Sequence, residues 1–221
     1  MTASYDGTIR AFDHSKRVIA QTQAHNAPIT GLCVVPSSGD PNTTSRLVAT
    51  SSHDMSTQLT RVSFEEGQTS SPLATLHLHT GPVSSISSDS SGSTLLTSSW
   101  DGLIASWDTS IPTEDEVPDP FVDSGERRKR RKLTQIDKPK RKAPLLVMKS
   151  HTARVSRVVF GPQNEKTAVS CGFDSTVRTW DVEMGLCTHT IVSVLRFGAY
   201  GMLAELLFQR MRLKNPSSMS Y

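Results

Sequence analysis

The chain lacks several features that would place it in common functional classes. Its 221 residues include only three cysteines, Cys33, Cys171 and Cys187, which show no metal-ligand spacing. An odd, scattered set of this kind suits a reducing compartment better than a secreted, disulfide-stapled protein. No basic stretch followed by an apolar run stands near Met1, so no secretory signal is visible. We therefore expect no disulfide and no metal site.

Motifs for nucleotide and acyl chemistry are also missing. The sequence has no glycine-rich phosphate loop and no nucleophile elbow. It has no acid/base pair that stands apart from a repeated pattern. We therefore predict no catalytic residues, no cofactor and no enzymatic activity.

The chain does contain one sequence motif that is repeated four times. Each copy has a run of small residues, a turn centred on Asp, and alternating residues that usually end in an aromatic and Asp. The turn residues Asp6, Asp54 and Asp101 lie 48 and 47 residues apart, and Asp174 follows after 73 more. A period in the forties is typical of propeller blades built from four short strands.

Each full period has room for four strands. A histidine and a short apolar segment precede three of the turns: His25 before 28–35, His79 before 83–86 and His151 before 155–160. A further apolar segment precedes two of these histidines, at 73–78 and 145–148. Together with the two strands of the hairpin, these segments predict four-stranded units.

The repeated motif resembles that of the WD-repeat family, whose blades carry a histidine, a tight Asp turn and a closing Trp-Asp. Trp107-Asp108 and Trp180-Asp181 match that ending, and Phe12-Asp13 nearly does. The second copy departs, because Thr60 stands where a tryptophan is expected. The resemblance implies an all-β fold, a partial WD-repeat β-propeller of about three four-stranded blades plus stray strands.

In that family the histidine, a strand Ser or Thr, the turn Asp and the Trp form a buried hydrogen-bonded set. The matching positions here are His79, Ser99 or its alternative Thr97, Asp101 and Trp107, then His151, Ser170, Asp174 and Trp180. An active site needs one constellation, whereas this one recurs from blade to blade. We therefore expect the sets to be structural, because buried polar groups are normally paired.

An insertion of different composition accounts for the long gap before Asp174. Residues 111–126 contain six acids and no base, and residues 127–142 contain ten bases and one acid, Asp137. Four prolines punctuate this segment, which has little apolar surface to bury. We expect a flexible loop between the third and fourth strands of a blade.

The basic half of the insertion predicts a nuclear localisation signal or a polyanion contact. Its candidate residues are Arg127, Arg128, Lys129, Arg130, Arg131, Lys132, Lys140, Arg141 and Lys142. Contact with RNA is a second interpretation of these residues, and it is compatible with a role in import. A solvated charge run with no partner is the third.

The chain is therefore divided into four parts. WD-repeat blades occupy 1–110, the disordered acidic and basic insertion 111–143, a further blade 144–192, and a divergent tail 193–221. The sequence of the tail does not follow the blade pattern, and altered splicing would explain this. The alternative is an amphipathic helix that binds a partner. Because Arg196 and Glu205 interrupt its apolar stretch, we predict no membrane span.

The repeats combined with the insertion and its flank at 143–157 resemble the WD-repeat ribosome-biogenesis factors of the PeBoW complex. The resemblance implies a scaffold for large-subunit rRNA maturation, located in the nucleus, nucleolus and nucleoplasm. Its implied partners are ribosome-assembly complex proteins and pre-ribosomal particles. That family has a seven-bladed propeller and an amino-terminal ubiquitin-like domain, so we expect this chain to be a fragment.

A substrate receptor of a ubiquitin ligase, or another generic propeller adaptor, is the alternative. Such receptors often carry an arginine two residues after the aspartate of Trp-Asp. Ser110 and Glu183 occupy those positions here. The docking signal for a ligase is therefore missing.

Overall fold

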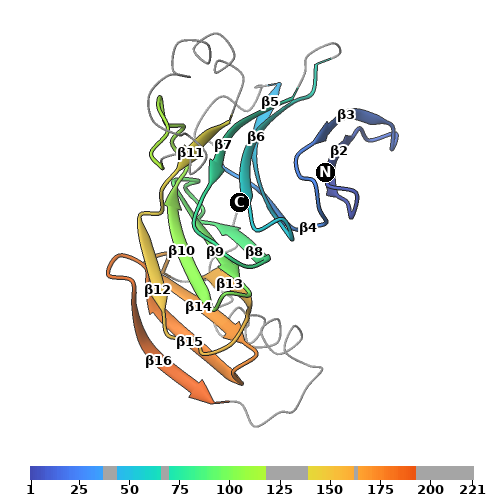
Figure 1. Ribbon diagram of the computed structural model, residues 1–221. Coiled ribbons are helices and arrows are strands. Elements are labelled where there is room, and N and C mark those ends of the chain that lie inside the picture. Colours follow the sequence, from blue (N-terminus) through green and yellow to red (C-terminus); the bar gives the residue numbers. More distant parts are fainter. Residues whose placement is uncertain (37–43, 66–69, 118–138, 162–163, 193–221) are drawn as a thin grey trace, which may run out of the picture.

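The computed structural model describes residues 1–36, 44–65, 70–117, 139–161 and 164–192. Within these ranges the chain forms strands and turns, without an α-helix. The strands make four sheets that follow one another along the chain, from the blue amino-terminal hairpins to the orange carboxy-terminal sheet (Figure 1). The predicted all-β architecture, a partial β-propeller, is confirmed.

The strands group by sheet. The first sheet has three strands, β1 (Thr2–Ala3), β2 (Thr8–Phe12) and β3 (Val18–Gln23). The second has β4 (Ile29–Val34), β5 (Ser45–Ser52), β6 (Thr57–Ser63) and β7 (Ser71–Leu76), with β11 (Lys140–Lys142) added parallel to β7. The third has β8 (Val83–Ser88), β9 (Thr94–Ser99), β10 (Leu103–Asp108) and β12 (Leu146–Lys149). The fourth has β13 (Val155–Phe160), β14 (Thr167–Gly172), β15 (Thr176–Asp181) and β16 (Leu186–Val192).

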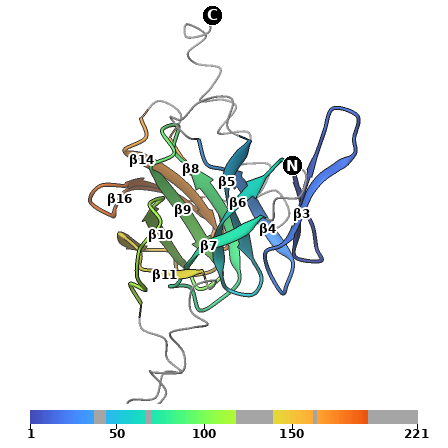
Figure 2. The ribbon, with the colours of Figure 1, turned by 90° about the horizontal axis from the view of Figure 1, so that it is seen from above.

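Neighbouring sheets pack face to face, which Figure 2 shows from above with β8, β9 and β10 between β14 and β16 on one side and β5 and β6 on the other. Alternation along the strands puts small apolar side chains on both faces, so each pair of sheets encloses a core. Trp107 is fully buried between the second and third sheets, and Trp180 between the third and fourth. The closing tryptophans are therefore the largest side chains in these two cores.

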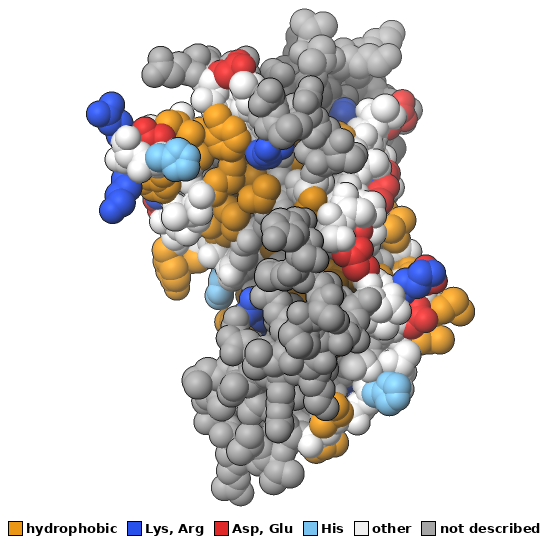
Figure 3. All heavy atoms as spheres, turned by 180° about the vertical axis from the view of Figure 1, so that it is seen from behind, with side chains coloured by type: hydrophobic (Ala, Val, Ile, Leu, Met, Phe, Trp, Pro, Cys, Tyr) orange, Lys and Arg blue, Asp and Glu red, His pale blue; other side chains and the backbone are white. Residues whose placement is uncertain are grey.

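The core between the first and second sheets is smaller. Its buried members are Ala11, Val48 and Val62, and no tryptophan contributes. Figure 3, seen from behind, shows hydrophobic side chains at the surface of the first sheet, at the upper left. In this sheet Phe12, Val18 and Ile19 are each at least 40% exposed. The first sheet is thus the least buried of the four.

The residue after each turn aspartate has a left-handed backbone. It is Gly7 in the first sheet, with φ 79°, and Gly102 in the third, with φ 83°. Met55 and Ser175 adopt φ 66° and 61° in the second and fourth sheets. Glycine adopts this conformation without a steric cost, whereas other residues do so rarely. The turn geometry is therefore imposed by the blade even where the sequence does not favour it.

Candidate functional site: repeated polar networks and the base of the insertion

In the third sheet one hydroxyl joins the histidine to the tryptophan. His79 Nδ1 lies 3.0 Å from Asp101 Oδ2, and its Nε2 lies 2.9 Å from Thr97 Oγ1. The indole Nε1–H of Trp107 donates to the same Thr97 Oγ1 at 2.9 Å. The hydroxyl in the network is therefore Thr97, the alternative to Ser99.

Ser99, the hydroxyl assigned first from the sequence, makes different hydrogen bonds. Its Oγ donates to the carbonyl of Gly81 at 3.0 Å and accepts the backbone N–H of Asp101 at 3.2 Å. The assignment to the histidine network is wrong because Ser99 lies two residues before the turn aspartate, where the strand is already entering the turn. Thr97 lies four residues before it, at the same spacing that separates Ser170 from Asp174.

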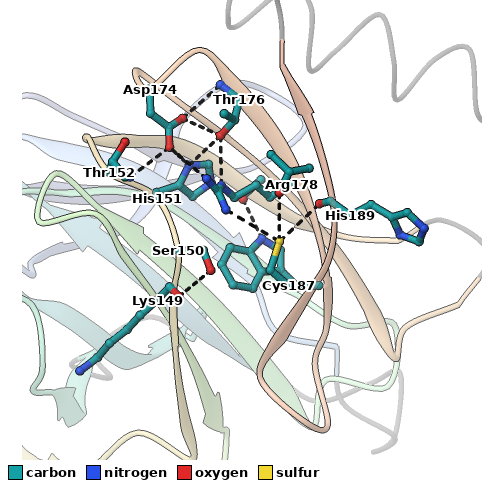
Figure 4. A network of polar contacts seen from close by, with 12 residues as sticks. Lys149, Ser150, His151, Thr152, Asp174, Thr176, Arg178, Cys187 and His189 are labelled. Atoms are coloured by element: carbon teal, nitrogen blue, oxygen red, sulfur yellow. Dashed lines mark hydrogen bonds and ion pairs between the residues drawn. The ribbon is translucent and has the colours of Figure 1, made fainter.

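The fourth sheet repeats the network with a serine. His151 Nδ1 lies 2.8 Å from Asp174 Oδ2, and its Nε2 lies 2.7 Å from Ser170 Oγ. Trp180 Nε1–H donates to Ser170 Oγ at 2.8 Å. Figure 4 shows Asp174, Thr152 and Thr176 gathered around the ring of His151. All four members of the predicted set are brought together here.

The directions of these hydrogen bonds are fixed by chemistry. Burial lowers the pKa of His151, and this outweighs the opposite effect of Asp174, so the ring is neutral at neutral pH. The carboxylate can only accept, so Nδ1 carries the proton and Nε2 accepts from Ser170. Trp180 can only donate, so Ser170 accepts one bond and donates the other. Every polar group in the chain from Trp180 to Asp174 is satisfied.

A third network, absent from the sets assigned by sequence, lies in the second sheet. His25 Nδ1 is 3.0 Å from Asp54 Oδ2, and its Nε2 is 2.9 Å from Thr50 Oγ1. Thr60 replaces the tryptophan, and its buried Oγ1 has no hydrogen-bond partner among the described residues. The sequence feature that predicts this network is the hydroxyl of Thr50, which stands four residues before Asp54.

The turn carboxylates are held in their charged form. Burial raises the pKa of Asp54, but hydrogen bonds from His25 and Ser56 outweigh it and lower the pKa to about 2. The same balance lowers the pKa of Asp101 and of Asp174 below the ordinary value of 3.8. Their side chains are 7% and 4% exposed. Groups so covered hold strands together and cannot reach a substrate.

The base of the insertion is ordered, contrary to the expected flexible loop over 111–143. Strand β11 pairs with β7, with Lys140 opposite Ala74 and Lys142 opposite Leu76. The backbone N–H of Glu116 donates to the carbonyl of Arg141 at 2.7 Å. Arg141 N–H in turn donates to Asp115 Oδ1 at 2.8 Å. Acidic and basic ends of the insertion therefore bind each other.

Lys142 is the anchor of this base. Its side chain is 2% exposed, and its ammonium group pairs with Asp108 and with the carbonyl of Ser110. It also donates to Ser110 Oγ at 3.1 Å. Burial raises the pKa of Asp108, but the bonds from Lys142 and Ser110 outweigh it and lower the pKa.

The structure thus divides the basic residues assigned to import or polyanion contact. Lys142 is wrong as a contact residue, because its charge is buried and already paired. Lys140 and Arg141 lie in β11 and are partly exposed. The remaining six residues, 127–132, lie outside the described part of the chain, as does the tail from 193 onward.

Other chemical groups give no further site in the described ranges. Cys33, Cys171 and Cys187 are free thiols there. No group of three potential metal ligands occurs among the described residues. In the same part of the chain, no helix has the length and apolar character needed to cross a membrane.

The four-stranded sheets, the histidine networks and the closing tryptophans define a propeller built from WD repeats. A family model described as WD domain, G-beta repeat, matches residues 70–108 and 142–181. These ranges contain both complete networks with tryptophan. The chain therefore contains WD repeats over these residues.

The curated relatives are ribosome-biogenesis proteins. The chain is 52% identical over 199 residues to "Ribosome biogenesis protein YTM1" of Laccaria bicolor, covering 87% of this chain and 44% of the relative. It is 50% identical over 202 residues to the protein of that name in Coprinopsis cinerea, covering 86% and 44%. The Saccharomyces cerevisiae protein is 33% identical over 234 residues, covering 92% and 49%. The chain spans about half the length or less of these relatives.

Proposed function

We propose that the chain is a protein–protein interaction scaffold in ribosome biogenesis, acting in large-subunit rRNA maturation within a nucleolar assembly complex. The observation that carries the proposal is the 52% identity over 199 residues to a ribosome-biogenesis protein. The polar groups that recur in the blades are consumed by their own networks, which supports a role through surfaces and not through catalysis. Ribosome-assembly proteins and pre-ribosomal particles are the proposed partners.

Affinity purification of the tagged chain from nuclear extract tests this proposal. We expect large-subunit assembly proteins and precursor rRNA to be recovered with it. A version extended to the full length of the relatives serves as the positive control. Recovery of ligase adaptors in place of assembly proteins would overturn the proposal, and recovery of assembly proteins by the longer version alone would assign their binding to regions outside this chain.

We further propose that residues 127–132 direct nuclear import. Six consecutive basic residues support this, and the burial of Lys142 leaves them as the main charge available to an import receptor. Alanine at all six positions should leave a fluorescent fusion in the cytoplasm. Lys140→Ala with Arg141→Ala is the matched control, and continued nuclear entry of the six-residue variant refutes the import role.

The same six bases are proposed to contact precursor RNA once in the nucleus. Phosphate contacts by lysine and arginine weaken steeply as salt concentration rises. Retention of the purified chain on an rRNA fragment should therefore fall with salt, and should fall further in the six-alanine variant. Equal retention of both chains at every salt concentration contradicts the contact.

A further inference from the structure

The residues directly before the turn aspartates occupy equivalent places in the sheets. They are Tyr5, His53, Trp100 and Phe173. Each of the last three donates its backbone N–H to the carbonyl of the residue that precedes the edge strand β4, β8 or β13 of its own sheet. The bonds run from His53 to Pro28 at 3.0 Å, from Trp100 to Pro82 at 3.0 Å and from Phe173 to Arg154 at 2.8 Å. The repeated bond places their side chains at the same edge of three successive sheets.

The side chains of His53, Trp100 and Arg154, one from each of three successive sheets, contact one another in series at this edge. The rings of His53 and Trp100 meet edge to face, with centroids 5.1 Å apart. The guanidinium carbon of Arg154 lies 4.4 Å from the centroid of the Trp100 ring. Trp100 is 37% exposed and Phe173 is 50% exposed. We refer to His53, Trp100, Arg154 and Phe173 as the turn row.

Arg154 departs from the repeat at a point where the fold does not require it. The two equivalent positions hold Pro28 and Pro82, and their carbonyls accept the same backbone bond. Arg154 is exposed, and stacking on the indole leaves the edge of its guanidinium available to donate. A side chain that the blade does not need, held in a fixed place by an aromatic ring, is suited to binding.

The charges of this edge favour an anionic ligand. The neighbouring carboxylates of Asp101 and Asp174 are covered and bonded to their histidines. Arg154 therefore presents its positive charge beside exposed aromatic surface. The third turn carboxylate, Asp54 beside His53, is 22% exposed and lies 3.0 Å from His25 Nδ1. A guanidinium binds a carboxylate through two parallel N–H bonds.

We propose that the turn row binds an extended acidic peptide segment of a partner protein. Arg154 pairs with a carboxylate of the peptide, while Trp100 and Phe173 pack against an adjacent apolar or aromatic side chain. Single-stranded RNA fits less well, because the row offers one cation and the face of Trp100 is already covered by Arg154. The inference rests on the proposed role as a protein scaffold and names the class of partner for one surface.

Fluorescence gives a direct test with the purified chain. Trp107 and Trp180 are buried, so Trp100 is the exposed tryptophan among the three in the sequence. The probe is a peptide of alternating Asp and Phe, titrated while tryptophan emission is followed. We expect saturable quenching, with affinity about tenfold weaker in Arg154→Pro, because the charge-assisted pair is lost. Proline is the residue that two other blades hold at this place, so the variant retains the backbone bond.

Matched controls separate the row from general charge effects. Arg17→Ala removes an exposed cation from the β2–β3 turn, at the other end of the strands, and should leave affinity unchanged. A peptide with Lys in place of Asp should not bind. Equal affinity in Arg154→Pro, or binding of an oligo(U) RNA without binding of the acidic peptide, overturns the inference. Recovery of assembly proteins from extract is measured separately, so either proposal can fail without the other.

Discussion

Thr60 illustrates how one residue can leave a blade incompletely satisfied. Its hydroxyl is buried, and within the described residues it has no partner, because the position belongs to the tryptophan that elsewhere donates to the strand hydroxyl. Thr60→Val keeps the shape and removes the unpaired group. We expect a gain of about 1 kcal/mol in the free energy of unfolding, which for a chain of this size raises Tm by about 2–4 °C.

The matched control for that prediction has the opposite sign. Thr97 has the bridging hydroxyl between His79 and Trp107. Thr97→Val should cost about 2 kcal/mol, because the buried indole N–H loses its acceptor. Thermal unfolding of both variants against the parent chain measures the difference. Stabilisation by both substitutions would contradict the network.

The pH dependence of stability follows from His151 and the turn aspartates. The folded pKa of His151 lies below its ordinary value of 6.5, so below that pH the unfolded chain binds the extra proton and is favoured. The aspartates Asp101 and Asp174 have lowered pKa values as well, so their contribution is complete above 3.8 and is lost as pH falls through the folded values. We expect Tm to fall in two stages on acidification, first below about 6.5 and then below about 4.

Two variants test whether His151 causes the first stage of the fall in Tm. His151→Gln should lower Tm at pH 7 and reduce the fall between pH 6.5 and 5, because the group that titrates on unfolding is gone. His14→Gln is the control, since His14 is exposed on the β2–β3 turn. A Tm profile of His151→Gln that runs parallel to that of the parent chain would remove His151 as the cause.

Sequence patterns could identify the network residues only where spacing is decisive. His79, Asp101 and Trp107 follow from their order along the repeat. Ser99 and Thr97 are both hydroxyls on one strand, and composition cannot separate them, whereas their distance from the turn can. The buried ion pair of Lys142 was beyond prediction, because the lysine sits in a basic run that reads as solvent-exposed and its partner Asp108 is 34 residues away.

At the scale of elements, the short strand β11 changes how the insertion is understood. Its parallel pairing covers the edge of β7, and Lys142 ties it to the end of β10. An exposed sheet edge invites pairing with other chains, so the added strand also protects the second sheet. The insertion therefore leaves and rejoins the blade through a fixed base.

The Lys142–Asp108 pair allows an asymmetric test of that base. The Lys142 side chain is 2% exposed, whereas the Asp108 side chain is 41% exposed. Asp108→Asn leaves a buried charge without its counterion and should cost about 3 kcal/mol. Lys142→Met leaves a carboxylate that water can solvate and should cost about 1 kcal/mol, since an apolar chain of similar size fills the site. Urea unfolding measures both, and a larger loss in Lys142→Met would contradict the burial of the lysine.

At the scale of the whole molecule, periodicity was enough to predict about three four-stranded blades, and the stray strands expected at the start form a three-stranded sheet. Four copies of one sequence motif predicted four hairpins, and the positions of His25, His79 and His151 predicted the strands that follow them. The pairing of β11 with β7 was not predictable, because it joins segments 66 residues apart without any repeat to mark them. The hydrogen bonds between sheets were likewise not predictable, since each depends on a single hydroxyl.

Two such hydroxyls join successive innermost strands. Thr30 Oγ1 in β4 donates to the carbonyl of Val83 in β8 at 2.6 Å. Ser84 Oγ in β8 lies 2.7 Å from the carbonyl of Val155 in β13. Each donor is the second residue of its strand, and each acceptor is the first residue of the next. The bonds therefore form a series that runs from sheet to sheet around the blades.

Ser156 holds the same place in β13, and within the described residues its hydroxyl makes no hydrogen bond. We therefore expect Ser84→Ala to cost about 1 kcal/mol in the free energy of unfolding, and Ser156→Ala to cost much less in this chain. Urea unfolding of the two variants measures the difference. Joined to a further blade, the chain should become sensitive to Ser156→Ala, because a carbonyl would then face that hydroxyl. Equal losses from the two substitutions in the present chain would show that the series does not stabilise the interfaces between sheets.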